Sequence, residues 1–343
     1  MISFLPSGGL GNQLFQIFST ISYALDTSMD FVFPTTRLFV DNPPRPMYWD
    51  SFLKQLEPYT TKHAWPHDVP TIYNTFELVC EKAHTYDKLP TVDRQTNYAI
   101  KGYFQSWKYF DEHKTDICNM IGIDQFRDNL RHVLPKNTHT ISMHFRMGDY
   151  KQKRCYHPVL PIEYYADALR DVLSSSKYKD AKTHCVVCFF ESDDEFDVNK
   201  ALSYMYTLPE FVRVEFRKAP SDLLDWEQLM LMSCCDDHII ANSTFSWWGA
   251  YFNPSSTKIV CYPGCWYGHQ LYYISTKDMF PPNWTVVSPR YIVECHCAQS
   301  EWWLNTVNST WCFKMFTESR SDPKRPEATR SDVGNRLNHT RTG

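Results

Sequence analysis

Short apolar runs and amphipathic stretches alternate along the second half of the chain. The runs have the length of buried strands and lie at 140–145, 185–190, 212–216, 238–241 and 258–262. Helical periodicity and capping residues predict helices among them, at 161–173, 221–232 and 245–252. An alternation of this kind favours a parallel sheet that is covered by helices on both faces. We therefore expect an α/β fold.

The first half of the chain has a weaker pattern of apolar positions. The elements expected there are a strand at 2–5, a tight loop at 6–12, a helix at 14–25 and a strand at 30–33. Residues 37–96 are rich in proline, tryptophan, tyrosine and threonine, and their weak periodicity predicts irregular loops and short helices. Loops of this kind are where recognition varies between related proteins.

The length of 343 residues exceeds one ordinary domain and predicts two. The simplest division has a Rossmann-like domain over 1–136 and a second one over 137–290. A C-terminal extension follows over 291–343, and we expect it to be partly disordered. Its last part, 319–343, is polar, charged and interrupted by proline.

Composition argues against two classes of function. The formal net charge is −4, so the chain has no basic field that would attract nucleic acid. No apolar run reaches the roughly 18–20 residues of a membrane-spanning helix, and the N-terminus lacks a signal-sequence pattern. We expect a soluble, cytoplasmic chain as written; a membrane-associated form in the secretory pathway is the alternative.

The chain has 12 cysteines, more than a cytosolic protein usually carries. Cys185 and Cys188 have CxxC spacing, but side chains alternate along the strand expected there, which argues against a shared metal. The better candidates for a zinc site or a disulfide are Cys261, Cys265, Cys295 and Cys297, with His269 and His296 nearby. Because their spacing matches no standard zinc finger, unpaired thiols are the default expectation.

Three segments follow predicted strands and open predicted helices, which is where open parallel sheets bind ligands. The first segment, 7–13, reads SGGLGNQ. Its glycines let the backbone approach a ligand, and the next helix offers free N–H groups to an anion. The alternative is an ordinary tight turn, and the spacing differs from the GxGxxG of nicotinamide-binding folds.

The second segment, 144–150, reads HFRMGDY and follows the strand at 140–145. An arginine at this place, Arg146, can bind a diphosphate with its two-pronged guanidinium. Asp149 would orient that arginine or act as a base. The alternative is a surface ion pair between the two residues.

The third segment, 239–249, reads IIANSTFSWWG. The hydroxyls of Ser243 and Thr244, with the N–H groups of the helix that they open, can receive a phosphate. The alternative is an ordinary helix N-cap. Trp247 and Trp248 are expected in the core rather than on a sugar-binding surface.

Together the three segments resemble glycosyltransferase family 11, the α-1,2-fucosyltransferases. The matches are GGLGNQ at 8–13, HxRxGDY at 144–150 and NSTFSWW at 242–248, with shorter ones at 163–165, 192–194 and 229–233. Their order and separation fit the family from residue 2 to about residue 287. The resemblance implies a GT-B-like fold, in which a donor crevice separates an acceptor-side domain over 1–136 from a GDP-fucose-binding domain over 137–290.

The resemblance also implies which residues contact the diphosphate of GDP-fucose. Arg146 would contact the β-phosphate, and Asn12, which follows Gly9 and Gly11, would face the diphosphate and the fucose. The family usually has a second arginine directly after the first. In this chain that position is Met147, so one arginine must suffice or phosphate binding is weaker.

For the guanosine, the resemblance implies a second group of residues. His144 would lie beside the guanosine, and Ser243, Thr244 and Phe245 would close around the phosphates and the base. Glu227, in the helix before the third segment, would read the guanine edge.

The reaction implied is inverting transfer of L-fucose from GDP-β-L-fucose to a hydroxyl of a sugar acceptor, with galactose O2 (an α-1,2 linkage) expected first. Negative charge accumulates on the departing phosphate, and a fixed cation with helix N–H groups stabilises it. Metal-dependent glycosyltransferases commonly hold their metal with Asp-x-Asp, which is absent from the sequence. We therefore expect no metal and no other cofactor. Asp149 and His157 are the candidates for the general base.

Two other functions remain open at this point. One is a fucosyltransferase with another linkage or a protein acceptor, because the donor motif is shared more widely than acceptor choice. The other is a non-catalytic sugar-binding module of the same fold, for which Met147 is the only hint. The expected partners are GDP-fucose and a galactose-terminated glycan.

Overall fold

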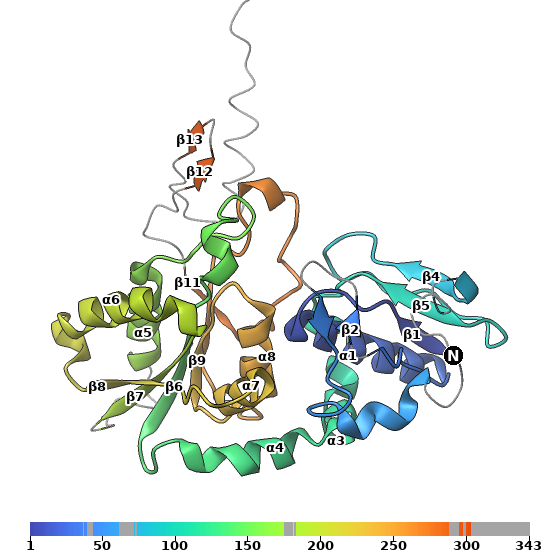
Figure 1. Cartoon of the computed structure of the whole chain (residues 1–343), viewed down its shortest axis with the longest axis horizontal. Coiled ribbons are helices and arrows are strands. Elements are labelled where there is room, and N and C mark those ends of the chain that lie inside the picture. The colour runs from blue at the N-terminus through green and yellow to red at the C-terminus, as the bar shows by residue number, and fades with distance from the viewer. Residues whose placement is uncertain are drawn as a thin grey trace, which may run out of the picture.

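Two α/β lobes lie side by side in the computed structural model of this chain (Figure 1). The structure describes residues 1–36, 38–39, 44–61, 72, 74–174, 181, 183–287, 295–297 and 300–302. The first lobe is built on a three-stranded sheet and the second on a six-stranded sheet, and all strand pairs within these two sheets are parallel. The predicted α/β, GT-B-like arrangement of two halves is confirmed.

The sheet of the second lobe reverses its strand order in the middle. Its strands are β6 (His139–His144), β7 (His184–Phe189), β8 (Val214–Lys218), β9 (Asp237–Ile239), β10 (Val260–Pro263) and β11 (Thr285–Val287). The order across the sheet is β11-β10-β9-β6-β7-β8, so the chain moves outward in one direction from β6 and in the other from β9. Open parallel sheets bind ligands outside the carboxyl ends of the strands at such a switch point.

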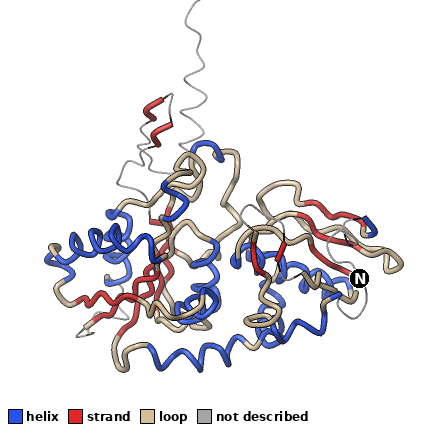
Figure 2. Tube along the Cα trace, viewed as in Figure 1, coloured by secondary structure: helices blue, strands red, loops and turns tan. Residues whose placement is uncertain are grey.

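Helices cover both faces of this sheet (Figures 1 and 2). One face carries α5 (Ile162–Leu173) and α6 (Glu195–Tyr206), and the face next to the first lobe carries α7 (Asp225–Ser233) and α8 (Thr244–Phe252). Along β7, Cys185 belongs to the core on the α7–α8 side and Cys188 to the core on the α5–α6 side. The expectation that these two cysteines face opposite ways is confirmed.

The first lobe has a smaller sheet, with the strand order β1-β5-β4. Its elements are β1 (Ile2–Phe4), α1 (Leu10–Thr27), β4 (Glu77–Cys80) and β5 (Tyr98–Lys101). Two further helices, α3 (Lys114–Ile121) and α4 (Ile123–Leu130), lead from this lobe to the second along the lower edge of Figure 1. The predicted domain limits 1–136 and 137–290 stay a prediction.

The remaining elements are short. Two antiparallel pairs join β2 (Leu38–Phe39) to β3 (Arg45–Pro46) and β12 (Cys295–Cys297) to β13 (Ser300–Trp302). The 3-10 helices lie at Lys54–Tyr59, Trp107–Tyr109, Asp111–His113, Arg131–Val133, Gly148–Lys151, Ser192–Asp194, Pro209–Phe211 and His269–Leu271.

Several of the predicted element positions need correction, among them the start of the first helix, which begins at Leu10 within the loop expected at 6–12. The strand expected at 30–33 forms only isolated bridges, from Phe31 and Phe33. The helix expected from a Ser221 cap begins instead at Asp225, because Leu224 is its N-cap residue. Within 37–96, strand β4 was not expected, and its short apolar core gave too weak a signal among the loops.

An aromatic core joins the two lobes. Helix α1 packs on α8, and the ring centroids of Phe15 and Trp247, and of Phe18 and Trp248, are 4.5 Å apart. The indole N–H of Trp248 donates a hydrogen bond to the carbonyl oxygen of Gly11 at 2.8 Å. Both tryptophans are fully buried, so their expected place in the core is confirmed. The lobes therefore share one continuous hydrophobic core.

The cysteine expectations have a mixed outcome. Cys261 is a free thiol in the core of the second lobe, and the Cys265 thiol donates to the carbonyl oxygen of Tyr267 at 3.6 Å. Cys155, which the sequence did not single out, is disulfide-bonded. The side chains of Cys295, Cys297 and His296 lie outside the described residues, and so does the segment 319–343.

One further expectation concerns membrane crossing. In the part of the chain that the structure describes, none of the helices is both long enough and apolar enough to span a bilayer.

Candidate active site

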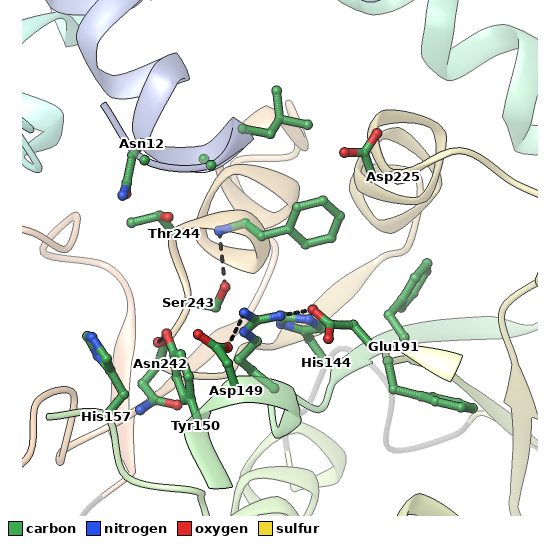
Figure 3. Close-up of a pocket in the computed structure, with 18 of the residues that line it drawn as sticks. Asn12, His144, Asp149, Tyr150, His157, Glu191, Asp225, Asn242, Ser243 and Thr244 are labelled. Atoms are coloured by element: carbon green, nitrogen blue, oxygen red, sulfur yellow. Dashed lines mark hydrogen bonds and ion pairs between the residues drawn. The ribbon is translucent and has the colours of Figure 1, made fainter. Parts of the chain in front are cut away.

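A cavity of about 1220 Å³ opens between the two lobes, at the carboxyl ends of β6 and β9. These are the two strands that flank the switch point of the larger sheet. Residues from all three predicted segments line it, as Figure 3 illustrates for part of the set. The predicted site residues on its wall are Gly9, Gly11, Asn12, His144, Arg146, Asp149, His157, Ser243, Thr244 and Phe245.

The glycines of the first segment allow two helices to begin at the same point of the cavity. Gly8 has a φ of +78°, in the region that favours glycine, and Gly9 is the N-cap residue of α1. A Cβ atom at Gly11 would lie 2.5 Å from the backbone carbon of Thr244, the first residue of α8. Gly11 is therefore required for close approach, and the free N–H groups of both helix N-termini lie near the same space.

Two buried glutamines on α1 hold the loops around this point. The Gln13 amide nitrogen donates to the carbonyl oxygens of Gly8 at 3.2 Å and Pro46 at 2.9 Å. The Gln16 side chain accepts from the Ser7 N–H at 3.1 Å and donates to the Gly102 carbonyl oxygen at 2.8 Å. The sequence pattern did not identify these roles, because one partner of each glutamine, Pro46 or Gly102, is distant in the chain.

Arg146 is held between two carboxylates. Its guanidinium donates to Asp149 Oδ1 at 2.6 Å and to Glu191 Oε1, and it lies 5.1 Å from the centre of the Tyr150 ring (Figure 3). The ion pair that the sequence offered as an alternative is thus present, and both of its residues line the cavity. Glu191 follows β7, so sequence distance hid this second partner. An anionic ligand of Arg146 must compete with these carboxylates.

His144 is a buried, neutral imidazole at the end of β6. Burial first, and then the positive charge of Arg146, lowers the pKa of His144 to about 3. Its Nδ1 atom has no hydrogen-bond partner within the described residues, and its ring lies 5.6 Å from that of Phe245. A buried ring nitrogen without a partner at a cavity wall is suited to a hydrogen bond with a ligand.

The third segment caps the N-terminus of α8 and also lines the cavity. The Ser243 hydroxyl accepts a hydrogen bond from the Phe245 N–H at 3.3 Å, as the capping alternative predicted. Asn242 joins two neighbouring loops, since its amide nitrogen donates to the carbonyl oxygens of Pro158 at 2.9 Å and Trp266 at 3.2 Å. This bonding fixes the start of α8 relative to the loop after β6.

The two candidate bases differ in their surroundings. Asp149 binds Arg146 with one oxygen and approaches Lys153 with the other at 3.4 Å, so both of its oxygens face cations. The His157 ring stacks on Tyr150 with the centroids 4.8 Å apart. Burial lowers the pKa of His157, partly offset by the charge of Asp149. A neutral imidazole at neutral pH can accept a proton, so His157 is the better placed of the two.

Glu227, which the resemblance assigned to the guanine edge, lies outside the cavity wall. Its carboxylate accepts from the Leu224 N–H at 2.8 Å and closes the N-terminus of its own helix. Among the described residues it is not part of the cavity wall. Asp225, two residues earlier, lines the cavity instead and accepts a hydrogen bond from the Tyr48 hydroxyl of the first lobe.

Among the described residues, one cation on the cavity wall has no ion-pair partner. Arg146, Lys153 and Lys218 each form an ion pair with a carboxylate. Arg45, on β3 of the first lobe, also lines the cavity, and it has no ion pair with any residue that the structure describes. Met147, the position where the resembling family has its second arginine, is 8% exposed and packs in the core of the second lobe.

Within the described ranges, no three histidine, cysteine, aspartate or glutamate side chains are grouped so that they would hold a metal ion. The expectation of a reaction without metal stays a prediction.

Comparison with known proteins gives a family. The sequence model described as "Glycosyl transferase family 11" matches residues 80–288, more than half of the chain. The Escherichia coli protein named O-antigen biosynthesis glycosyltransferase WbnK is 28% identical over 297 residues, which cover 76% of this chain and 93% of that protein. An Escherichia coli alpha-1,2-colitosyltransferase is 25% identical over 303 residues, covering 81% and 96%.

Solved structures also resemble the chain, at lower similarity. The crystal structure of the fucosyltransferase NodZ from Bradyrhizobium has a TM-score of 0.39 at 12% identity, covering 74% of this chain and 93% of NodZ.

Proposed function

Since this chain belongs to glycosyl transferase family 11, we propose that it transfers L-fucose from GDP-β-L-fucose to a hydroxyl of a sugar acceptor, with inversion at the anomeric carbon. The glycosyltransferase activity follows from the family. The fucosyl donor, the linkage and the acceptor are the parts that we propose.

The observation that carries the proposal is the meeting of Arg146 with two helix N-termini at one cavity. Arg146 follows β6, and the N-termini of α1 and α8 are in contact through Gly11 and Thr244. A leaving nucleoside diphosphate develops negative charge on its β-phosphate. A fixed guanidinium and oriented N–H groups stabilise that charge where it develops, which lowers the barrier for the departure of GDP.

The wall of the cavity beyond Arg146 suits a nucleoside. His144 offers an uncharged ring with a free nitrogen, and the Phe245 ring lies beside it. Guanine has N–H donors on its Watson–Crick edge, which a carboxylate accepts. We assign that contact to Asp225, because it lines the cavity and Glu227 does not.

The acceptor hydroxyl must lose its proton as it attacks. We assign the base to His157, whose imidazole is kept neutral by burial and lies on the side of the cavity opposite Asp225 (Figure 3). Asp149 then keeps the guanidinium of Arg146 in place, since it already binds it at 2.6 Å.

For the acceptor we propose a galactose-terminated glycan, attacked through O2 to give an α-1,2 linkage. The name of one relative states an alpha-1,2-colitosyl transfer, which supports this linkage and makes a colitosyl donor the second candidate. A protein acceptor, or binding without transfer, remains the alternative that an assay must test.

We expect the purified chain to release GDP from GDP-fucose in the presence of a β-galactoside, and to do so in excess EDTA. The reason is that Arg146 and the helix N-termini supply the positive potential which a metal supplies in other glycosyltransferases. Mass spectrometry of the product would show the addition of one deoxyhexose. Activity that disappears on chelation and returns with Mn²⁺ would contradict metal independence. GDP binding without release of the sugar from any donor would favour a sugar-binding module.

Arg45 is the residue that we assign as the second cation of the donor site. It would supply the second positive charge, because Met147 is uncharged and packs in the core of the second lobe. Arg45→Ala should raise KM for GDP-fucose roughly tenfold, the cost of about 1.4 kcal/mol of lost charge-assisted bonding. Arg94→Ala is the matched control, since Arg94 is an exposed arginine of the same lobe outside the cavity wall. An unchanged KM in Arg45→Ala would remove this assignment.

A further inference from the structure

Three polar side chains from distant segments form a chain of hydrogen bonds across the cavity. The Tyr267 hydroxyl, in the loop after β10, donates to Gln105 Oε1 at 3.0 Å. The Gln105 amide nitrogen, in the loop after β5, donates to Asn12 Oδ1 at 2.9 Å. All three residues line the cavity. This series of hydrogen bonds thus connects the second lobe to the start of α1 in the first lobe.

Each hydrogen bond in this series has a defined donor and acceptor. Burial, and next the neighbouring Tyr150, raises the pKa of Tyr267 above its usual range, so its hydroxyl keeps the proton that it donates. The Gln105 oxygen is then the acceptor, and its nitrogen must face Asn12. Because the Asn12 oxygen is used, its NH₂ group is left to donate elsewhere, and Figure 3 draws that nitrogen at the cavity end of the side chain.

The residue before Gln105 has an unusual backbone conformation. Its neighbour Phe104 has a φ of +53° although it is not glycine, and the Phe104 side chain is fully buried. The Glu81 carboxylate accepts from the N–H groups of Tyr103 at 2.9 Å and Phe104 at 3.1 Å. Unusual backbone conformations of this kind persist only where the surroundings hold them, and they occur often at functional sites.

From this geometry we propose that Gln105 is a positioning residue, which orients the Asn12 amide so that its NH₂ group faces the diphosphate and the sugar of the donor. The Tyr267 hydroxyl in turn orients the Gln105 side chain, so the orientation of the Asn12 amide depends on contact between the lobes. The statement that the Asn12 NH₂ group faces a donor rests on the proposed function. The orientation of Asn12 itself does not.

Steric contact with Gly8 limits the Asn12 side chain from the other side. A Cβ atom at Gly8 would lie 2.4 Å from the Asn12 amide nitrogen, so the amide packs directly against the Gly8 backbone. Asn12 is therefore confined between Gly8 and Gln105. Removing the Gln105 side chain removes the neighbour on one side of Asn12 and the hydrogen bond that this neighbour donates to the Asn12 oxygen.

Kinetics of three variants test the proposal. Gln105→Leu should lower kcat roughly 10- to 100-fold, because loss of orientation at a reacting centre costs about that much. Gln105→Glu should lose a comparable amount, since a carboxylate accepts from Tyr267 but cannot donate to Asn12. Tyr267→Phe should have a smaller effect in the same direction. Gln95→Leu and Tyr204→Phe are the matched controls, because both residues are exposed and outside the cavity wall.

A double-mutant cycle separates positioning from a role of Gln105 alone. In an Asn12→Ala background, Gln105→Leu should cause little further loss, because both changes remove the same interaction. Losses that add fully would overturn the proposal, and so would a Gln105→Leu variant with unchanged kcat. Loss of folding is checked by melting temperature, and the isosteric Gln105→Glu keeps the test valid if Gln105→Leu unfolds.

A crystal structure of the Gln105→Leu variant decides the matter without any donor. The Asn12 side chain should leave its present rotamer, and an unmoved Asn12 would overturn the proposal. If the wild-type chain transfers no sugar from any GDP-sugar, the proposed function fails, while this structural result still tests the positioning of Asn12.

Discussion

Replacing Arg146 with alanine should lower kcat by roughly 10²–10³-fold, while the affinity for GDP-fucose changes less. The loss corresponds to about 3–4 kcal/mol, the usual cost of removing one group that stabilises developing negative charge. Arg146 lies at the carboxyl end of β6, next to the N-termini of two helices, where the leaving diphosphate would be. Steady-state kinetics with varied donor concentration measure both constants.

Two related variants separate the possible roles of Arg146. Arg146→Lys should recover only part of kcat, since an ammonium cannot hold Asp149 and a phosphate with the same fork geometry. Glu191→Gln should act in the opposite direction on binding and lower KM for the donor, because this carboxylate competes for the guanidinium. A near-normal kcat in Arg146→Ala, with only KM raised, would make the residue a binding contact and not a catalytic one.

Replacing Trp248 with alanine should destabilise the whole chain by about 3–5 kcal/mol, the usual range for removing a buried tryptophan. Trp248 is fully buried between α1 and α8, touches Phe18 and Phe110, and donates to the Gly11 carbonyl oxygen. Its loss leaves a cavity and an unpaired carbonyl in the core that joins the lobes. Unfolding in denaturant, followed by fluorescence and circular dichroism, measures the effect.

A graded series checks that packing is the cause. Trp248→Phe should lose less than half of the alanine effect, because a six-membered ring still fills much of the site, although the five-membered ring and its N–H donor are lost. Phe196→Ala is the surface control, since that side chain is 80% exposed. A single cooperative transition is expected for the wild type and for all three variants. Two separate transitions in the wild type would contradict a shared core.

Local signals in the sequence were sufficient to select residues that line one cavity. Each of the three segments needs small residues directly after a strand, and this requirement is visible without knowledge of the fold. Ten predicted residues therefore line one cavity. The core position of Trp247 and Trp248 was predictable for a similar reason, since they follow a strongly apolar strand.

Relations between distant segments were not predictable from the same signals. Glu191 binds Arg146 across 45 positions, and Gln105 reaches Asn12 across 93. Such pairs depend on strand order and on how the lobes pack, which no local pattern encodes. The place of Glu227 outside the cavity wall has a local origin. The helix begins at Asp225, so Glu227 is the third helical residue and bonds to the Leu224 N–H, while Asp225 faces the cavity.

The shared aromatic core also limits how such an enzyme can be engineered. Helices α1 and α8 bury Phe15, Phe18, Trp247 and Trp248 against each other, so neither lobe carries a complete interior of its own. Whole-lobe exchange between relatives would have to bring matching α1 and α8 surfaces, or the chimera would expose these rings to water. Grafting of single loops avoids this problem. The segment between β5 and α3 is an exception, because Phe110 packs on Phe18 and Trp248, and Asp111 accepts a hydrogen bond from the Tyr251 hydroxyl of α8 at 2.7 Å.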